Sequence, residues 1–175
     1  MEIIDGNTIR IAGVVKESTV DGPGFRYVVF TQGCPHNCKG CHNPESWCFD
    51  AGKDFTDETL IKLLNILNKP YITGLTLSGG NPTDSDPKEL VKIMKAVKDE
   101  FDGEKDIWLF SGNYLEDLQE REDLKDVLDL VDVLVDGPFI LGQRDITLAF
   151  RGSKNQRIWE KDSLGNFVIS NKFRE

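Results

Sequence analysis

All the cysteines and histidines of this chain lie in one short segment. The six residues are Cys34, His36, Cys38, Cys41, His42 and Cys48. A disulfide framework would distribute its cysteines so that they join distant segments, and it would need an oxidising compartment. The clustering therefore predicts a metal centre that is built within a single loop.

The spacing of the first three cysteines, CxxxCxxC, is compatible with three kinds of metal site. One is a structural zinc site closed by His36, His42 or Cys48, although zinc sites usually use two ligand pairs separated by a longer interval. The second is an iron–sulfur cluster held by four cysteines, with Cys48 as the last ligand. The third is a 4Fe-4S cluster held by three cysteines, with one iron left open. Spacing alone favours the third and leaves all three open.

Length and charge exclude several other classes of protein. The chain has 175 residues, enough for one globular domain, and 39% of them are hydrophobic. Its 21 Lys and Arg against 30 Asp and Glu give a net charge of −9, which disfavours binding to a nucleic-acid backbone or to an anionic membrane surface. The sequence has neither a membrane-spanning apolar stretch nor a secretory signal at its start, so we expect a cytoplasmic protein.

Strand-like and helix-like runs alternate along the chain, which is typical of a parallel α/β fold. The predicted strands cover residues 8–16, 25–31, 72–77, 107–110 and 131–135. The predicted helices cover 56–69, 87–97 and 115–130. From about residue 145 the tail predicts irregular β structure, with short segments at 146–150, 157–160 and 167–170.

Polar turns that contain glycine follow four of these predicted strands. They are Gly33-Cys34, Ser78-Gly79-Gly80, Ser111-Gly112 and Asp136-Gly137. Each is also explained as an ordinary tight turn. However, parallel α/β proteins bind ligands at the carboxyl ends of their strands, and one of the four turns begins the cysteine cluster. The sequence therefore predicts one shared site at this edge.

The cysteine loop resembles the cluster motif of radical S-adenosylmethionine (radical SAM) enzymes. Residues 20–26, VDGPGFR, resemble the segment that glycyl-radical-enzyme activases carry before this loop. Four further segments are similar to the activases of anaerobic ribonucleotide reductases. They are residues 41–47, 108–112, 132–139 and 150–157. The resemblance extends from about Gly13 to Arg157.

This resemblance implies a single radical SAM domain over residues 1–175, with the cluster loop at 33–48. Its fold would be an incomplete parallel (β/α) barrel, since the chain is too short for a complete barrel of about 250 residues. The implied cofactors are a 4Fe-4S cluster and SAM. The implied reaction is reductive cleavage of SAM, after which the 5′-deoxyadenosyl radical takes a hydrogen from a glycine of anaerobic ribonucleoside-triphosphate reductase. Reduced flavodoxin or a similar protein would donate the electron.

The resemblance also implies roles for the cysteines and for the turn after residue 77. Cys34, Cys38 and Cys41 would ligate three irons, which leaves Cys48 as a free thiol. The segment Ser78-Gly79-Gly80-Asn81 matches a GGEP-type turn that contacts the methionine amino group of SAM. Asn81 departs from this pattern, because the family usually has an acid there.

Four more residues take roles from the resemblance. Ser111 and Asp136 would lie on the SAM side of the site, with Asp136 holding the SAM carboxylate through a cation. Asp21 and Arg26 would face the glycine of the partner or the cofactor. Each has a simpler explanation as a turn residue or a solvated charge.

Three alternative functions remain at this point. The chain could activate another glycyl radical enzyme, or it could be a radical SAM enzyme that acts on a small molecule. It could also be a non-catalytic zinc or iron–sulfur binding module. Iron and sulfide analysis of a Cys48→Ala variant separates the last from the first two.

Overall fold

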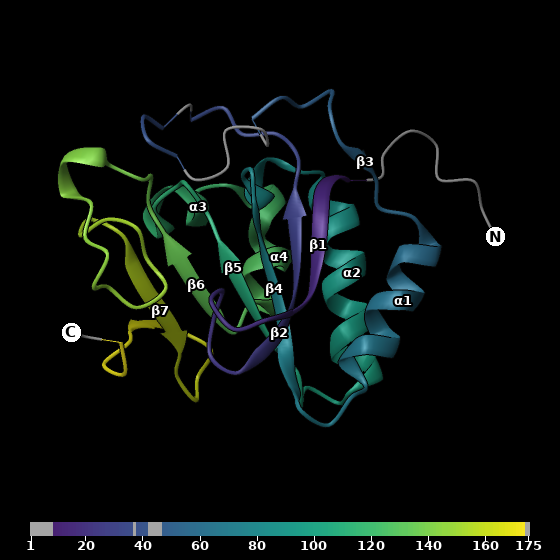
Figure 1. Ribbon diagram of the computed structural model, residues 1–175. Helices are drawn as coiled ribbons and strands as arrows, with labels where there is room; N and C mark the ends of the chain where they lie inside the picture. Colours follow the sequence, from purple (N-terminus) through teal and green to yellow (C-terminus); the bar gives the residue numbers. More distant parts are fainter. Residues whose placement is uncertain (1–8, 37, 42–46, 174–175) are drawn as a thin grey trace.

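A mixed β-sheet forms the centre of the computed structural model, which describes residues 9–36, 38–41 and 47–173 (Figure 1). Within these ranges eight strands have the order β3-β1-β2-β4-β5-β6-β7-β8. Their bounds are Arg10–Ser18 (β1), Phe25–Thr31 (β2), Lys53–Asp54 (β3), Ile72–Gly79 (β4), Asp106–Phe110 (β5), Val133–Asp136 (β6), Arg157–Lys161 (β7) and Phe167–Ile169 (β8).

The four central strands, β2, β4, β5 and β6, are parallel to one another, which confirms the α/β class. The outer strands are antiparallel to their neighbours. β1 and β2 are joined by residues 19–24 alone, too short a link for the crossover that a parallel pair requires. Because β3 and β8 form the two edges of the sheet, the architecture is consistent with an incomplete barrel.

Four α-helices connect the strands in the described part of the chain. They are Asp57–Leu67 (α1), Pro87–Glu100 (α2), Leu115–Gln119 (α3) and Lys125–Leu130 (α4). The helix predicted over 115–130 is interrupted by a 3₁₀ turn at Glu122–Leu124. Its acidic side chains repel one another at helical spacing, and Arg121 takes an extended backbone conformation at the break.

The helices cover one face of the sheet, and that face holds the main core (Figure 1). Tyr27 and Val29 of β2 point into this core, so the intervening side chains of β2 point to the opposite face. On that second face Trp108 packs edge-on against Phe150 and Phe173 from the C-terminal part of the chain. An aromatic cluster thus replaces helices on the second face.

In the C-terminal part, two of the three predicted β segments form strands and one does not. Strands β7 and β8 coincide with the predicted segments at 157–160 and 167–170. The strand predicted at 146–150 is wrong, because these residues form turns. Asp145 accepts hydrogen bonds there from the backbone N–H and the hydroxyl of Thr147, at 2.9 and 2.5 Å, which fixes a turn in place of a strand.

None of the helices in the described ranges is both long enough and apolar enough to span a bilayer.

Candidate metal and cofactor site

The turns after β2 and β4 are joined directly by backbone hydrogen bonds. The N–H of Gly80 donates to the carbonyl of Thr31, and the N–H of Asn81 donates to the carbonyl of Gly33, both at 2.8 Å. Gly79 has φ +103°, and a Cβ on it would lie 2.5 Å from the backbone nitrogen of Thr31. Glycine is therefore required where the two turns meet, and the cysteine loop begins at this junction.

The cysteine loop brings three half-buried thiols to this edge of the sheet. Burial raises the pKa of the Cys34 thiol, and the neighbouring Cys38 and Cys41 raise it further, while a hydrogen bond from the backbone of His36 lowers it. Cys48 is exposed and forms no disulfide. His42 lies outside the described residues.

The residues around the loop fit a sulfur-rich cluster. The indole Nε1 of Trp47 is buried without a hydrogen-bond partner among the described residues, and the Trp47 carbonyl accepts the N–H of Cys34 at 3.1 Å. Such N–H groups donate to the sulfur atoms of iron–sulfur clusters. Within the described ranges, no three His, Cys, Asp or Glu side chains lie close enough together to hold a single metal ion. A cluster differs in this respect, since each thiolate binds a separate iron.

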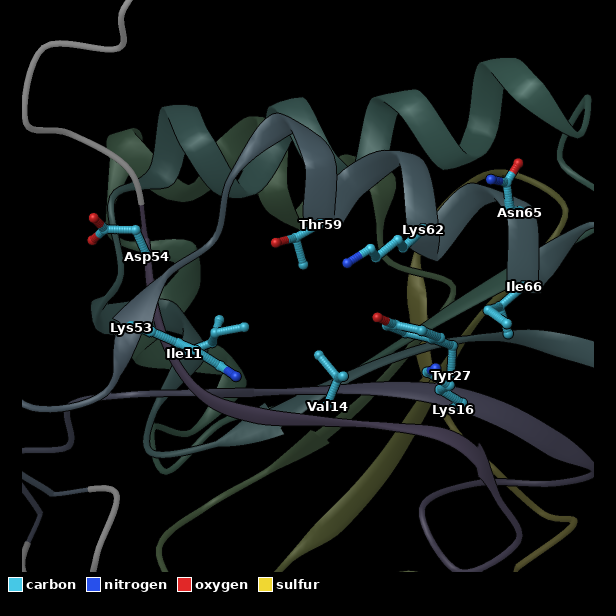
Figure 2. A pocket seen from close by; sticks show the side chains of 10 residues that line it. All are labelled: Ile11, Val14, Lys16, Tyr27, Lys53, Asp54, Thr59, Lys62, Asn65 and Ile66. Atoms are coloured by element: carbon cyan, nitrogen blue, oxygen red, sulfur yellow. The ribbon is translucent and has the colours of Figure 1, made fainter.

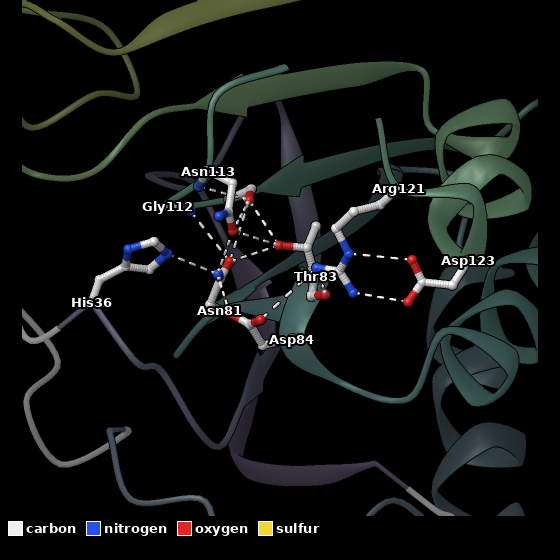
Figure 3. Close-up of polar contacts among 9 residues, drawn as sticks. His36, Asn81, Thr83, Asp84, Gly112, Asn113, Arg121 and Asp123 are labelled. Carbon is white, nitrogen blue, oxygen red and sulfur yellow. Dashed lines mark hydrogen bonds and ion pairs between the residues drawn. The ribbon is translucent and has the colours of Figure 1, made fainter. Parts of the chain in front are cut away.

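Asn81 is the centre of a buried polar network behind the turn (Figure 3). Its side-chain oxygen accepts hydrogen bonds from the N–H of Gly112 at 3.2 Å and from the hydroxyls of Thr83 and Ser111, at 3.0 and 3.3 Å. These contacts join the end of β4 to the end of β5. Ser111, which the sequence predicts to face SAM, thus lies in this network beside Asn81.

The amide nitrogen of Asn81 faces three acceptors. It lies 2.6 Å from a carboxylate oxygen of Asp84, 2.9 Å from the side-chain oxygen of Asn113 and 3.1 Å from Nε2 of His36. An acid at position 81, as in the GGEP-type turn that this segment resembles, would direct a second carboxylate toward Asp84. The neighbourhood of this chain therefore suits an amide.

His36 links the cysteine loop to the ends of β4 and β5. Besides its contact with Asn81, its ring lies against the backbone of Gly112, where a Cβ would approach the His36 ring to 2.5 Å. Sequence reasoning left the role of His36 open, because nothing in the spacing of the motif points to a contact with a turn that follows a different strand.

A cavity of about 430 Å³ opens on the second face of the sheet, next to the cysteine loop. Three residues predicted for the site line it: Asp21, Cys41 and Ser78. The remaining lining residues are Val20, Phe30, Phe110, Phe139, Leu148, Phe150, Arg151, Gly152 and Gln156. Sequence reasoning gave no role to the four phenylalanines: Phe30 and Phe110 lie on strands, where an aromatic residue usually indicates core packing, and no local pattern points from Phe139 or Phe150 to the cavity.

Arg26 does not line this cavity, and its contacts favour a positioning role. Its side chain is fully buried and forms an ion pair with Asp106 at 2.7 Å. Its Nε donates to the hydroxyl of Thr76 at 2.7 Å, and that hydroxyl donates to the backbone carbonyl of Asp21 at 2.8 Å. Arg26 thus holds the loop that carries Asp21 against the sheet.

Asp136 is also fully buried, and protein groups contact both of its carboxylate oxygens. Arg157 donates to one oxygen from Nε at 3.1 Å, and to the other from a terminal nitrogen at 2.6 Å. The second oxygen also accepts the N–H of Leu115 at 2.8 Å. The resemblance implied a place beside SAM, whereas these contacts favour a structural role that joins β6, β7 and α3.

The segment 151–157 connects the C-terminal part to the turn after β6. Gln156 accepts the N–H of Gly152 at 2.9 Å and donates to the carbonyl of Gly137 at 3.0 Å. In the sequence, the similarity of residues 150–157 to the activases was the one sign that this segment matters, and it did not indicate what the segment does. The structure makes the segment one wall of the cavity.

Comparison with known proteins identifies the class of this site. Residues 20–159 match the family described as 4Fe-4S single cluster domain, so the chain belongs to that class. It further belongs to the family of anaerobic ribonucleoside-triphosphate reductase-activating proteins. This assignment confirms the resemblance.

Three relatives with that name support the assignment. The chain is 43% identical to the protein of Enterobacteria phage T4 over 80% of its own length and 86% of the relative. It is 38% identical to the Escherichia coli K12 protein, over 78% of its own length and 89% of the relative. It is 41% identical to the Haemophilus influenzae protein, over 79% of its own length and 90% of the relative. Among solved structures, QueE from Escherichia coli shows a weak likeness, with a TM-score of 0.42 and 13% identity over 61% of this chain and 53% of QueE.

Proposed function

We propose that this protein is a radical SAM activase that generates a glycyl radical on an anaerobic ribonucleoside-triphosphate reductase. In this proposal Cys34, Cys38 and Cys41 hold a 4Fe-4S cluster, and SAM binds to the open iron. One structural observation supports the proposal in addition to family membership. Cys41, Ser78 and Asp21 line the same cavity, so a cluster on the cysteine loop would adjoin the space in which a cofactor and a peptide segment could meet.

When bound, the cluster and SAM supply a one-electron cleavage whose product removes the hydrogen from a glycine Cα. The chain contributes position and the exclusion of water. Phe30, Phe110 and Phe150 give the cavity an apolar wall that would keep a reactive radical from solvent. The anchored carbonyl of Asp21 holds the loop at the mouth in place.

The proposal includes a partner, an electron donor and a compartment. A glycine of the partner reductase would enter the cavity as part of an extended segment, because a residue without a side chain presents its Cα most openly. Reduced flavodoxin or a similar low-potential protein would supply the electron. The net charge of −9 argues against binding to nucleic acid or to an anionic membrane, and we place the protein in the cytoplasm.

Cleavage of SAM by the reconstituted protein tests this function. With dithionite as reductant and no oxygen, the wild-type protein should form 5′-deoxyadenosine and methionine. Cys38→Ala should abolish product, while Cys48→Ala, the matched control, should retain four irons and full activity. Bound zinc without sulfide, or loss of the cluster in Cys48→Ala, would contradict the three-cysteine assignment and favour one of the alternatives.

A further inference from the structure

A second cavity lies on the opposite, helix-covered face of the sheet, between α1 and the edge formed by β1 and β3 (Figure 2). Its volume is about 480 Å³, within the range of small-molecule sites. The lining residues are Ile11, Val14, Lys16, Tyr27, Lys53, Asp54, Thr59, Lys62, Asn65 and Ile66. None of them belongs to the candidate metal and cofactor site.

Tyr27 gives this cavity an unpartnered polar group. The side chain is 2% exposed, and its hydroxyl, which points into the cavity, has no hydrogen-bond partner among the described residues and remains accessible to solvent there (Figure 2). Burial raises the pKa of Tyr27, so the hydroxyl remains a proton donor at neutral pH. A ligand that supplies an acceptor would replace water at this hydroxyl with a hydrogen bond inside the cavity.

The charges around the cavity are mainly positive, although the chain as a whole carries −9. Lys16, Lys53 and Lys62 line it from three different elements, and Lys62 also lies 3.5 Å from a carboxylate oxygen of Glu58 at the surface (Figure 2). Asp54 is the only acid in the lining, and it is paired with Arg10 at 2.9 Å. Three ammonium groups around one space favour an anion that carries several charges, such as a chain of phosphates.

Apolar side chains also line the cavity. Ile11 and Val14 come from β1 and Ile66 from α1, and they offer a surface for an organic body rather than for a bare inorganic anion (Figure 2). We propose that this cavity binds an organic polyphosphate of the nucleoside triphosphate class. Its phosphates would lie between the three lysines, and its base and ribose would lie against the apolar side chains, with an acceptor atom facing the Tyr27 hydroxyl.

Isothermal titration calorimetry with ATP tests this site on the full chain that carries its cluster. SAM is present at saturation, so that the adenosine part of ATP is excluded from the cofactor site. We expect one saturable site per chain. The double variant Lys53→Gln/Lys62→Gln should weaken ATP binding about tenfold, since two exposed charge pairs each contribute up to about 1 kcal/mol. Tyr27→Phe should weaken ATP binding about threefold or more, since a hydrogen bond contributes about 1 kcal/mol.

Two sets of controls distinguish the site from general charge attraction. Lys92→Gln/Lys95→Gln removes the same charge from the exposed side of α2 and should leave ATP affinity unchanged. Adenosine and tripolyphosphate should each bind more weakly than ATP. Absence of saturable ATP binding, unchanged affinity in the Lys53/Lys62 variant, or equal affinity for tripolyphosphate and ATP would each overturn the proposal. Because the readout is binding with SAM present, failure here leaves the proposed activase function untouched.

Discussion

Asn81 shows how a single amide can replace an acid when its neighbours are acceptors. Its side chain is 1% exposed and donates toward Asp84 while it accepts the N–H of Gly112. At this position the usual family acid and the asparagine of this chain differ in charge and in the ability to donate. The surrounding residues, not the motif, determine which of them fits.

Restoring the family acid should therefore destabilise this protein. Asn81→Asp directs a buried carboxylate toward Asp84 and removes the donor to Asn113, so we expect a loss of about 2–4 kcal/mol in the free energy of unfolding. Chemical denaturation measures it. Asn65→Asp, an exposed site on α1, is the matched control and should change stability by less than about 0.5 kcal/mol. Equal stability of Asn81→Asp and the wild type would contradict the network in Figure 3.

His36 should affect how firmly the loop retains its cluster. His36→Ala removes the contact with Asn81 and the packing against Gly112, so the loop should open more readily. We expect iron to be released to a chelator severalfold faster than from the wild type, because a lost hydrogen bond costs about 1 kcal/mol. His36→Gln retains an acceptor and should restore part of the difference. Identical release rates in all three proteins would show that His36 does not anchor the loop.

At the scale of elements, one arginine holds α3, β6 and β7 together. Arg157 bonds to the buried carboxylate of Asp136 and forms two hydrogen bonds to Glu116, at 2.9 and 2.7 Å. Its guanidinium also lies over the rings of Tyr114 and Trp159, at 5.1 and 4.8 Å from their centroids. The helix α3 and the antiparallel strand β7 thus depend on the same side chain.

Removal of Arg157 should lower the free energy of unfolding substantially. Arg157→Gln leaves Asp136 buried without its cationic partner, and such a change typically costs about 3–5 kcal/mol. Thermal or chemical unfolding of the apoprotein measures the loss. Lys92→Gln breaks an exposed ion pair with Asp57 instead and should cost less than about 1 kcal/mol. Comparable losses in the two variants would argue against the structural role of the Asp136 pair.

The same contact predicts a pH dependence of stability. Hydrogen bonds from Arg157 lower the pKa of Glu116 from 4.5 to about 2. Because the pKa is lower in the folded state, the contribution is complete above pH 4.5 and is lost as the pH falls toward 2. Glu116→Gln should remove this part of the acid dependence, while stability at pH 7 falls only slightly because Glu116 is exposed. An unchanged acid profile in the variant would contradict the pairing.

The elements also show what sequence reasoning can and cannot predict. The strand at 25–31 was predicted with its observed bounds, because aromatic and β-branched residues between two glycine-rich turns leave few alternatives. The pairing direction of β1 depends on the short link at 19–24, which the alternating pattern does not reveal. That Cys34, Cys38 and Cys41 lie together in one loop was predictable because their spacing is local; their role as cluster ligands stays a prediction. The contacts of Asn81, His36 and Arg26 were not, since each joins segments that are distant in the sequence.

At the scale of the whole molecule, the two faces of the sheet are covered by different parts of the chain. One face packs against helices and forms the main core. The other has aromatic side chains and the segment 151–157, and its cavity adjoins the cysteine loop. A face without helices leaves room for a segment of another protein to approach the carboxyl ends of the parallel strands.

The proposed function requires that this protein generate a radical on a glycine of a partner reductase. Electron paramagnetic resonance tests it most directly, on an anaerobic mixture of the reconstituted protein, SAM, a reductant and the anaerobic ribonucleoside-triphosphate reductase from the same source. We predict a glycyl radical signal that requires SAM, survives Cys48→Ala and disappears in Cys38→Ala. SAM cleavage without a radical on the reductase would contradict the claim, as would a signal that persists in Cys38→Ala.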